Sequence, residues 1–187
     1  ALTRHIILIS TVHVLYGWHP LHLAKMGATL DHMSGGRWGL NLVTGFRPHE
    51  MDMFGLETIP RDQRYVMATE FTEMLERLWR EDANVTWDGD HWSLHNAYVS
   101  PKPTYGRPIM VSAGSSDAGL AYATQYSDLI FITSPSGADL DDALATLPAY
   151  TQHIRDLATA RGRSIRTVIN PHVICRETER EVQEVCS

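Results

Sequence analysis

The chain has 187 residues, of which 43% are hydrophobic, so it is long enough to form one sizeable domain with its own core. Its formal net charge is −6 and no basic stripe compensates locally, which argues against a partner with a phosphate backbone such as a nucleic acid. No apolar run approaches about eighteen residues, so the sequence predicts no membrane-spanning helix.

The two cysteines, Cys175 and Cys186, have neither C-x-x-C spacing nor the density of a secreted disulfide framework. We therefore expect a reducing, cytoplasmic location. Neither end of the chain resembles a natural domain end, because an apolar run starts within the first residues and a charged helical pattern stops at the last. We expect an internal piece of a longer protein.

The amino-terminal part alternates strand and helix patterns. Residues 6–14 form an apolar, β-branched run that predicts a buried strand, and it turns polar near its end. Residues 20–33 follow with helical spacing, a proline in the first turn and two glycines after the last. Residues 37–45 then predict a second buried strand that delivers Asn41 and Thr44 near its carboxyl end.

The middle of the chain departs from this alternation. Residues 46–60 read as a long connection, and residues 61–79 have apolar side chains three and four apart, as on a helix. Residues 84–100 predict a hairpin with an Asp-Gly tip, which we expect to be an excursion outside the repeating units.

The remaining elements restore the alternation. Strands are expected at residues 108–112, 128–133 and 167–175, separated by helices that end near Tyr126 and Arg161. This rhythm implies right-handed βαβ units and a parallel sheet. Because no Gly-x-Gly-x-x-Gly fingerprint is present, five such units fit part of a TIM (β/α)8 barrel better than a dinucleotide-binding fold. Residues 1–187 are thus expected to form one partial barrel domain.

In such a barrel the carboxyl ends of the strands share one mouth, where chemistry occurs. Polar or small residues occur at the end of every expected strand: Ser10, Thr11, His13; Asn41, Thr44; Ser112, Ser115, Ser116; Thr133, Ser134; Asn170, His172. Together they predict a pocket able to hydrogen-bond a flat heterocycle. Taken singly, each is equally explained by strand ends meeting water.

The stretch at residues 113–119, Ala-Gly-Ser-Ser-Asp-Ala-Gly, predicts an anion site. Small residues before a helix let backbone N–H groups approach a phosphate, and Ser115 or Ser116 adds a hydroxyl. Arg64 could supply the balancing cation. The competing interpretations are an ordinary serine helix cap and a solvated arginine on a helix face. Glu50 could bind a ligand or cap its own loop, and the sequence does not decide.

Ten histidines raise the question of a metal site. No His-Glu-x-x-His arrangement is present, and we expect no bound metal. His13 stands at the end of a strand, where a reacting centre is expected, and its near-neutral pKa suits proton exchange with an intermediate. A wall histidine that packs and hydrogen-bonds locally explains it equally well.

Two stretches together resemble a known family. Residues 25–45 are similar almost throughout to the main signature of the bacterial luciferase-like, flavin-dependent monooxygenases, and residues 113–119 are similar to the second. Within that family the chain resembles the two-component group, which includes the pyrimidine, alkanesulfonate and dimethyl sulfone monooxygenases. The resemblance covers the whole chain as strands three to seven of the barrel, which implies that the first two strands and the eighth lie outside it.

The resemblance also implies which residues contact the cofactor, reduced FMN. The implied flavin contacts are Asn41, Glu50, the Arg64–Tyr65 pair and Ser116, with Thr11 and His13 on the strand that faces the isoalloxazine. It further implies a non-proline cis peptide bond within residues 10–12.

The function implied by the resemblance is an FMNH2- and O2-dependent monooxygenase that acts on a small sulfonate, sulfone or pyrimidine-like substrate through a peroxyflavin. A separate flavin reductase would supply the reduced flavin, and relatives of this kind are homodimers or homotetramers. His13 is the catalytic candidate, as a hydrogen-bonding partner of the peroxide or substrate. Three alternatives stay open: a deazaflavin-dependent hydride-transfer enzyme, a non-catalytic flavin-binding relative, and a metal-dependent barrel hydrolase.

Overall fold

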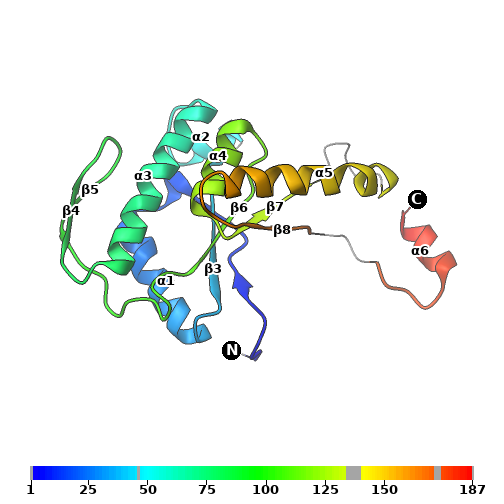
Figure 1. The fold of residues 1–187 in the computed structure, drawn as a ribbon, viewed down its shortest axis with the longest axis horizontal. Helices are drawn as coiled ribbons and strands as arrows, with labels where there is room; N and C mark the ends of the chain where they lie inside the picture. The colour runs from blue at the N-terminus through cyan, green and yellow to red at the C-terminus, as the bar shows by residue number, and fades with distance from the viewer. Residues whose placement is uncertain (1, 46, 134–139, 171–173, 187) are drawn as a thin grey trace.

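The computed structural model describes residues 2–45, 47–133, 140–170 and 174–186. Its centre is a parallel sheet with the order β1-β3-β6-β7-β8, in which β2 also pairs with β3. The strands are β1 (Leu8–Ile9), β2 (His13–Val14), β3 (Trp38–Val43), β6 (Ile109–Ser112), β7 (Leu129–Phe131) and β8 (Arg166–Val168). The sheet curls as an open half-barrel, which confirms the expected α/β fold of a partial TIM barrel (Figure 1).

The first expected strand is split into two short ones. Leu8 pairs with Trp38 and His13 pairs with Leu42, so both halves still run beside β3. Between them, the hydroxyl of Ser10 accepts a hydrogen bond from the backbone N–H of Asn41 at 3.2 Å. A side chain therefore replaces the backbone acceptor at this point of the ladder, and the regular strand is interrupted.

The expected cis peptide bond within residues 10–12 is wrong. In the described part of the chain, the cis bond is the one between Ser100 and Pro101.

Helix α1 (Pro20–Ser34) follows the short 3-10 turn η1 (Leu15–Gly17) and matches the sequence prediction. It begins with Pro20 at its first position, and the Nδ1 atom of His19 accepts a hydrogen bond from the backbone N–H of Leu21. It ends at Gly35, whose φ of 67° is the left-handed conformation that favours glycine. Proline and glycine therefore set the two ends of the helix.

The main core lies between α1, α3 (Arg61–Arg80) and the adjacent face of β3. Leu40, Phe71 and Leu75 are completely buried there. The indole N–H of Trp79 donates to the carbonyl oxygen of Ala24, which ties the two helices together. Burial of such large apolar side chains stabilises the fold by about 1.5–3 kcal/mol each, so this packing fixes α3 against β3.

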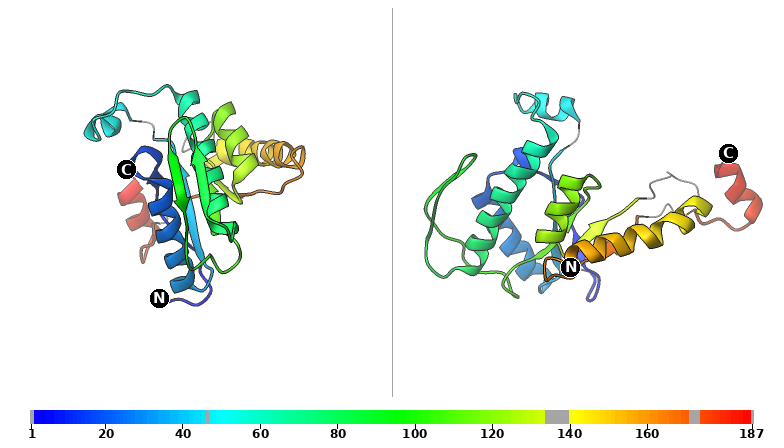
Figure 2. Two further views of the ribbon diagram at one scale, coloured as in Figure 1. Left: turned by 90° about the vertical axis from the view of Figure 1, so that its left-hand side faces the viewer. Right: turned by 45° about the horizontal axis from the view of Figure 1, so that its top comes forward.

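Between β3 and β6 the chain forms a short helix and a hairpin in addition to α3. The connection at residues 46–60 contains a helix, α2 (Pro48–Met53), which the sequence interpretation missed because it is short. Strands β4 (Val85–Asp88) and β5 (Ser93–Ala97) pair antiparallel as a hairpin outside the parallel sheet, beside α3 (Figures 1 and 2).

The carboxyl-terminal part is more extended. Helix α4 (Asp117–Tyr126) packs on α3, and α5 (Leu140–Thr159) packs on α4 and continues through Pro148 without a break. Strand β8 is shorter than the expected strand at residues 167–175, since Ile169 and Asn170 are exposed and unpaired in the sheet, and residues 171–173 lie outside the described ranges. Helix α6 (Glu179–Cys186) lies far from the sheet (Figure 1). Among the described residues, no helix combines the length and apolarity that a bilayer crossing requires.

Candidate functional site

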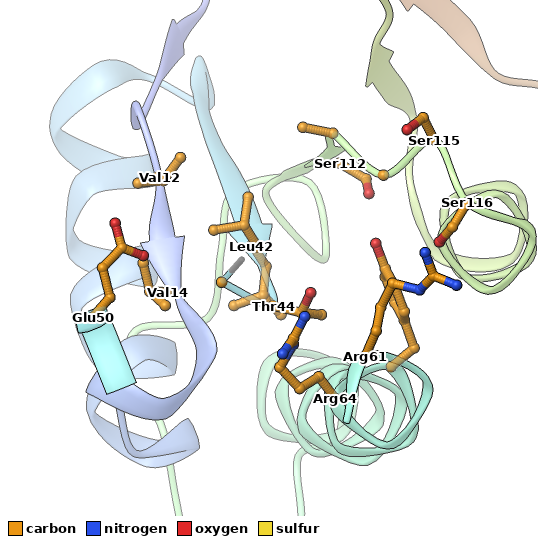
Figure 3. Close-up of a pocket in the computed structure, with 15 residues that line it drawn as sticks. Val12, Val14, Leu42, Thr44, Glu50, Arg61, Arg64, Ser112, Ser115 and Ser116 are labelled. Carbon is orange, nitrogen blue, oxygen red and sulfur yellow. The ribbon is translucent and has the colours of Figure 1, made fainter. Parts of the chain in front are cut away.

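A cavity of about 440 Å³ lies at the carboxyl ends of β2, β3 and β6 (Figure 3). This volume is within the usual range for a small-molecule site, about 300–1,000 Å³. Val12, Val14 and Leu42 form an apolar wall on one side. The opposite side is polar and comes from the start of α3 and the turn before α4, so the cavity joins an apolar surface to a cationic, hydroxyl-bearing one.

The turn after β6 places two serine hydroxyls in the cavity. Both Ser115 and Ser116 line it, and Ser116 is the N-cap of α4, where its Oγ accepts a hydrogen bond from the backbone N–H of Gly119 at 3.2 Å. The cap interpretation from the sequence is therefore correct in geometry. It leaves the hydroxyl hydrogen of Ser116 free to donate to a ligand, because the cap uses only a lone pair.

Glycine is required in this turn by close packing against α3. A Cβ atom on Gly114 would lie 2.5 Å from the Tyr65 hydroxyl oxygen and 2.9 Å from the Cα of Gly119. The turn can therefore approach both the first part of α3 and its own helix only without side chains at these positions. As a result Tyr65, another expected flavin contact, lies beside the serines.

Arg64 is a buried cation in the first turns of α3. It lines the cavity and is only 8% exposed. Its Nη1 donates to the carbonyl oxygen of Ile59 at 2.7 Å, whereas its Nε is buried and has no hydrogen-bond partner among the described residues. A buried guanidinium with unused donors is unfavourable by itself, so this arrangement favours an anionic guest.

Arg61 also lines the cavity, although the sequence interpretation did not select it. It lies three residues before Arg64, which places both side chains on one face of α3. That spacing was the signal that could have revealed it. Its described ion contact is with the neighbouring Asp62, at 3.4 Å.

Glu50 reaches the cavity from α2, on the side away from the serines (Figure 3). Close to it lies Tyr16, a residue that the sequence interpretation treated as loop. The hydroxyl of Tyr16 is buried without a hydrogen-bond partner in the described part of the structure. Burial raises the pKa of this phenol, and the charge of Glu50 raises it further while that of Arg64 lowers it. Tyr16 is therefore a neutral hydrogen-bond donor on which the charges of Glu50 and Arg64 both act.

Asn41 and Thr11 lie just outside the cavity lining. The Nδ2 of Asn41 donates to the carbonyl oxygen of Thr11 at 2.8 Å. Its Oδ1 is buried and has no hydrogen-bond partner within the described ranges. The residues that follow Asn41 at the end of β3, from Leu42 to Gly45, all line the cavity, so Asn41 lies at its edge and holds an unused acceptor.

His13 is not brought to the cavity. Its neighbours Val12 and Val14 line the cavity, and side chains alternate along a strand, so His13 lies on the other face of β2. Its ring packs 4.9 Å from that of Trp18, and its Nδ1 is 2.9 Å from the Oγ of Ser10. Burial lowers its pKa, which keeps the ring neutral at pH 7. The geometry is that of a packed wall histidine.

Other strand-end residues contribute less. Thr133 and Asn170 are exposed and do not line the cavity, while Ser134 and His172 lie outside the described residues. In the ranges that the structure describes, no three His, Cys, Asp or Glu side chains lie close enough together to hold a metal ion. The structure thus brings Glu50, Arg64, Tyr65, Ser115 and Ser116 together at one cavity with the strand-end residues Thr44 and Ser112, and it leaves Thr11, His13 and Asn41 out of the lining.

Comparisons with known proteins agree with this architecture. A family model described as luciferase-like monooxygenase matches residues 1–186. An FMNH(2)-dependent dimethylsulfone monooxygenase of Pseudomonas fluorescens (strain Pf0-1) is 33% identical over 168 residues, or 90% of this chain and 44% of the relative. Pyrimidine monooxygenase RutA of Stutzerimonas stutzeri (strain A1501) is 34% identical over 183 residues, or 96% of this chain and 48% of the relative.

The fold is likewise shared with solved structures. The EDTA monooxygenase EmoA from Chelativorans sp. BNC1 superposes with a TM-score of 0.78 at 26% identity, covering 94% of this chain and 44% of that one. The chain spans about half the length of the curated relatives that it matches.

Proposed function

The chain belongs to the luciferase-like monooxygenase family, and from this premise we propose that it forms the flavin-holding part of an FMNH2- and O2-dependent monooxygenase. The observation that carries the proposal is the cavity at the carboxyl end of the sheet. There a buried arginine, whose Nε has no hydrogen-bond partner among the residues that the structure describes, shares one wall with two serine hydroxyls. This donor set suits the phosphate of FMN.

The phosphate would lie between α3 and the turn before α4. Ser115 and Ser116 donate hydroxyl hydrogens, and the N-terminus of α4 adds the positive end of its dipole. Arg64 is positioned to donate through its unused Nε, and Tyr65 lies beside the glycine turn with its hydroxyl available. Together these groups neutralise an anion without moving the backbone.

The flat ring would lie along the apolar wall. Val12, Val14 and Leu42 give it a surface that excludes water from one face. Asn41 offers its buried, unpaired Oδ1 to a ring N–H, and Glu50 borders the far side. Thr11 is assigned an indirect role, since its carbonyl oxygen orients Asn41. His13 supports the strand through Ser10 and does not contact the flavin.

When bound, the reduced flavin supplies the electrons that activate O2 and place one oxygen atom on the substrate. The protein residues bind the phosphate, orient the ring and keep water from it. By analogy with the relatives named above, the substrate is a small sulfone-, sulfonate- or pyrimidine-like molecule.

The proposal includes three features of the whole protein. A separate flavin reductase supplies FMNH2 transiently, by analogy with the FMNH(2)-dependent relative. The protein acts in the cytoplasm and assembles as a homodimer or homotetramer.

Two measurements test the proposal together. Titration with FMN and with anaerobically reduced FMN should show saturable binding, and addition of O2 with a sulfone or pyrimidine substrate should give oxygen uptake matched by oxygenated product. No binding of either redox state would contradict the proposal. Flavin binding without oxygen uptake, but with hydride transfer from a reduced deazaflavin, would assign the cavity to a different chemistry.

A further inference from the structure

We infer that Arg61 is a second phosphate-binding arginine, which makes the cavity selective for the dianion of a terminal phosphate monoester. A phosphodiester or an unphosphorylated ring would gain little from it. The inference rests on the proposed flavin function and adds a residue and a selectivity to it.

The first observation is the position of Arg61. It begins α3 and lines the same cavity as Arg64, one helical turn away. Figure 3 shows the Arg61 side chain extending on the side of Ser116, whereas that of Arg64 extends on the side of Thr44. Of the two guanidinium groups, that of Arg61 is therefore the one that lies beside the serine turn in this view.

The second observation is the balance of charge. Within the described ranges, the ionisable side chains that line the cavity are two arginines, one tyrosine and a single carboxylate. This carboxylate belongs to Glu50 and lies on the other side of the cavity (Figure 3). Asp62 contacts Arg61 at 3.4 Å, but the two side chains are 64% and 78% exposed, so this pair contributes little. The serine side of the cavity thus has more positive charge than one monoanion can neutralise.

The third observation indicates that this wall of the cavity binds an anion. Two helices begin at this wall, α3 without a side-chain cap and α4 with Ser116, so both dipoles present their positive ends. Helix ends alone do not make a site. Here the buried Nε of Arg64, which has no hydrogen-bond partner in the described part of the chain, is an independent sign of a missing acceptor.

The chemistry of phosphate esters turns this geometry into selectivity. A monoester has three free oxygens and a second pKa of about 6, so its charge approaches −2 above neutral pH. Each of the two phosphates of FAD is a diester-type group with one negative charge and two free oxygens. Arg64 and the serines bind the first negative charge of the phosphate, and Arg61 stabilises the second. FMN is therefore favoured over FAD and riboflavin, and more strongly as the pH rises through about 6.

The test is to titrate the wild-type protein and three variants with FMN, FAD and riboflavin at pH 5.5 and 7.5. The variants are Arg61→Ala, Arg61→Lys and Arg80→Ala. Arg80 is the matched control at the far end of α3, and its described ion contact is with Glu76, at 3.8 Å. At pH 7.5, Arg61→Ala should weaken FMN binding about tenfold, as expected for one partly exposed charge-assisted hydrogen bond. Riboflavin binding should not change. Arg61→Lys should retain most of the pH dependence, and Arg80→Ala should match the wild type.

Riboflavin also controls for titration of the protein itself. The elements around the cavity carry other charged or titratable groups: Tyr16, His49, Glu50, Asp62, Arg64, Tyr65 and Asp117. Any pH effect that they exert on the ring appears with riboflavin as well as with FMN, and any that they exert on a phosphate of constant charge appears with FAD. The pH dependence seen with FMN alone reports the second phosphate charge, and it should shrink in Arg61→Ala. Inorganic phosphate should compete with FMN in the wild type and compete less well in Arg61→Ala.

The outcomes separate the two proposals. Wild-type affinity and pH dependence for FMN in a folded Arg61→Ala variant would overturn the role of Arg61 and leave the proposed function standing. Absence of FMN binding by the wild-type protein would overturn the proposed function and the inference together. Equal preference for FMN and FAD at pH 7.5 would overturn the selectivity.

Discussion

The two ends of the parallel sheet treat their charged side chains in opposite ways. At the amino end, Arg107 and Arg163 both lie within ion-pair distance of Asp128. At the carboxyl end, Arg64 is buried beside a cavity, and neither its Nε nor the Asn41 Oδ1 has a hydrogen-bond partner among the described residues. The same strands therefore connect an end built for stability to an end that is incomplete without a ligand, as expected for a barrel of this kind.

The amino end is organised around Asp128, which precedes β7. Arg107 donates to both of its carboxylate oxygens, at 2.6 and 2.7 Å, and the backbone N–H of Met110 donates to it at 2.9 Å. Burial alone would lower the pKa of Arg107, but the hydrogen bonds that it donates to Asp128 and the charges of Asp128 and Glu76 raise it. Arg163 lies 3.8 Å from the same carboxylate, although its Nε has no hydrogen-bond partner in the described part of the chain. This network ties β6, β7 and β8 together.

The largest effect is expected from Asp128→Ala, which removes the centre of the amino-end network. It leaves Arg107, whose side chain is 13% exposed, without its bidentate partner. The free energy of unfolding, measured in urea, should fall by about 3 kcal/mol. FMN affinity should stay unchanged while the protein is folded. A parallel loss of FMN affinity would show that the two ends are not independent, and Asp128→Asn should cost less because it keeps an acceptor.

Ser116→Asp should have the next largest effect, and at the opposite end. Aspartate caps a helix as well as serine does, so stability should be retained. Its charge repels the phosphate, and at short range in a protein this costs about 3 kcal/mol, or roughly a hundredfold in FMN affinity. Ser116→Asn is the matched control, since it caps α4 without charge and should bind FMN only a few-fold more weakly. Equal affinities of the two variants would place the phosphate elsewhere.

Arg64→Ala should weaken FMN binding by about 2 kcal/mol, roughly thirtyfold, through lost charge-assisted hydrogen bonds. Unlike Asp128→Ala, it should change the unfolding free energy of the ligand-free protein by less than about 1 kcal/mol, because a half-paired buried cation contributes little stability. Calorimetric titration and urea unfolding measure the two quantities. Unchanged flavin affinity would remove Arg64 from the site.

Glu70→Gln is expected to have the smallest effect and tests the hairpin, a region that belongs to neither end. Burial would raise the pKa of Glu70, but hydrogen bonds from the His91 side chain and from the backbone N–H groups of Trp92 and His91 lower it. A carboxyl group with a depressed folded pKa stabilises the protein above its unfolded pKa, 4.5, and loses that contribution as the pH falls through the folded value.

The measurement is urea unfolding of both proteins as a function of pH. At pH 7 Glu70→Gln should be less stable by about 1 kcal/mol. Below about pH 4.5 the wild-type stability should fall towards that of the variant, because the difference between them depends on the ionised Glu70. A constant difference down to pH 3 would contradict the role of Glu70, and FMN affinity should be unaffected throughout.

Much of the fold follows from local sequence patterns. Pro20 and the glycines after Ser34 mark the ends of α1, and the apolar runs mark β3 and β6. Of the predicted residues that meet at the cavity, Ser115 and Ser116 follow from the rule that parallel strands present their carboxyl ends together, whereas Tyr65 and the role of Glu50 came from the family resemblance. The break between β1 and β2 was not, since it depends on the Ser10 hydroxyl reaching a backbone group across the sheet.

Side-chain direction limited the prediction of the site. His13 and Val12 are adjacent in sequence, but their side chains point to opposite faces of the sheet. The register that pairs His13 with Leu42 directs His13 to Trp18 and directs Val12 to the cavity. Arg61 could have been found from its spacing to Arg64. Tyr16 could not, because only the folded loop brings its hydroxyl near Glu50 and Arg64.

The most direct measurement is a crystal structure of the protein with FMN bound. The phosphate is predicted to lie within hydrogen-bonding distance, about 3 Å, of the Ser116 Oγ and the Arg64 guanidinium, with the ring along Val12 and Leu42. A phosphate bound away from the turn before α4, or a cavity that stays empty at saturating FMN, would contradict the assignment of this end of the sheet.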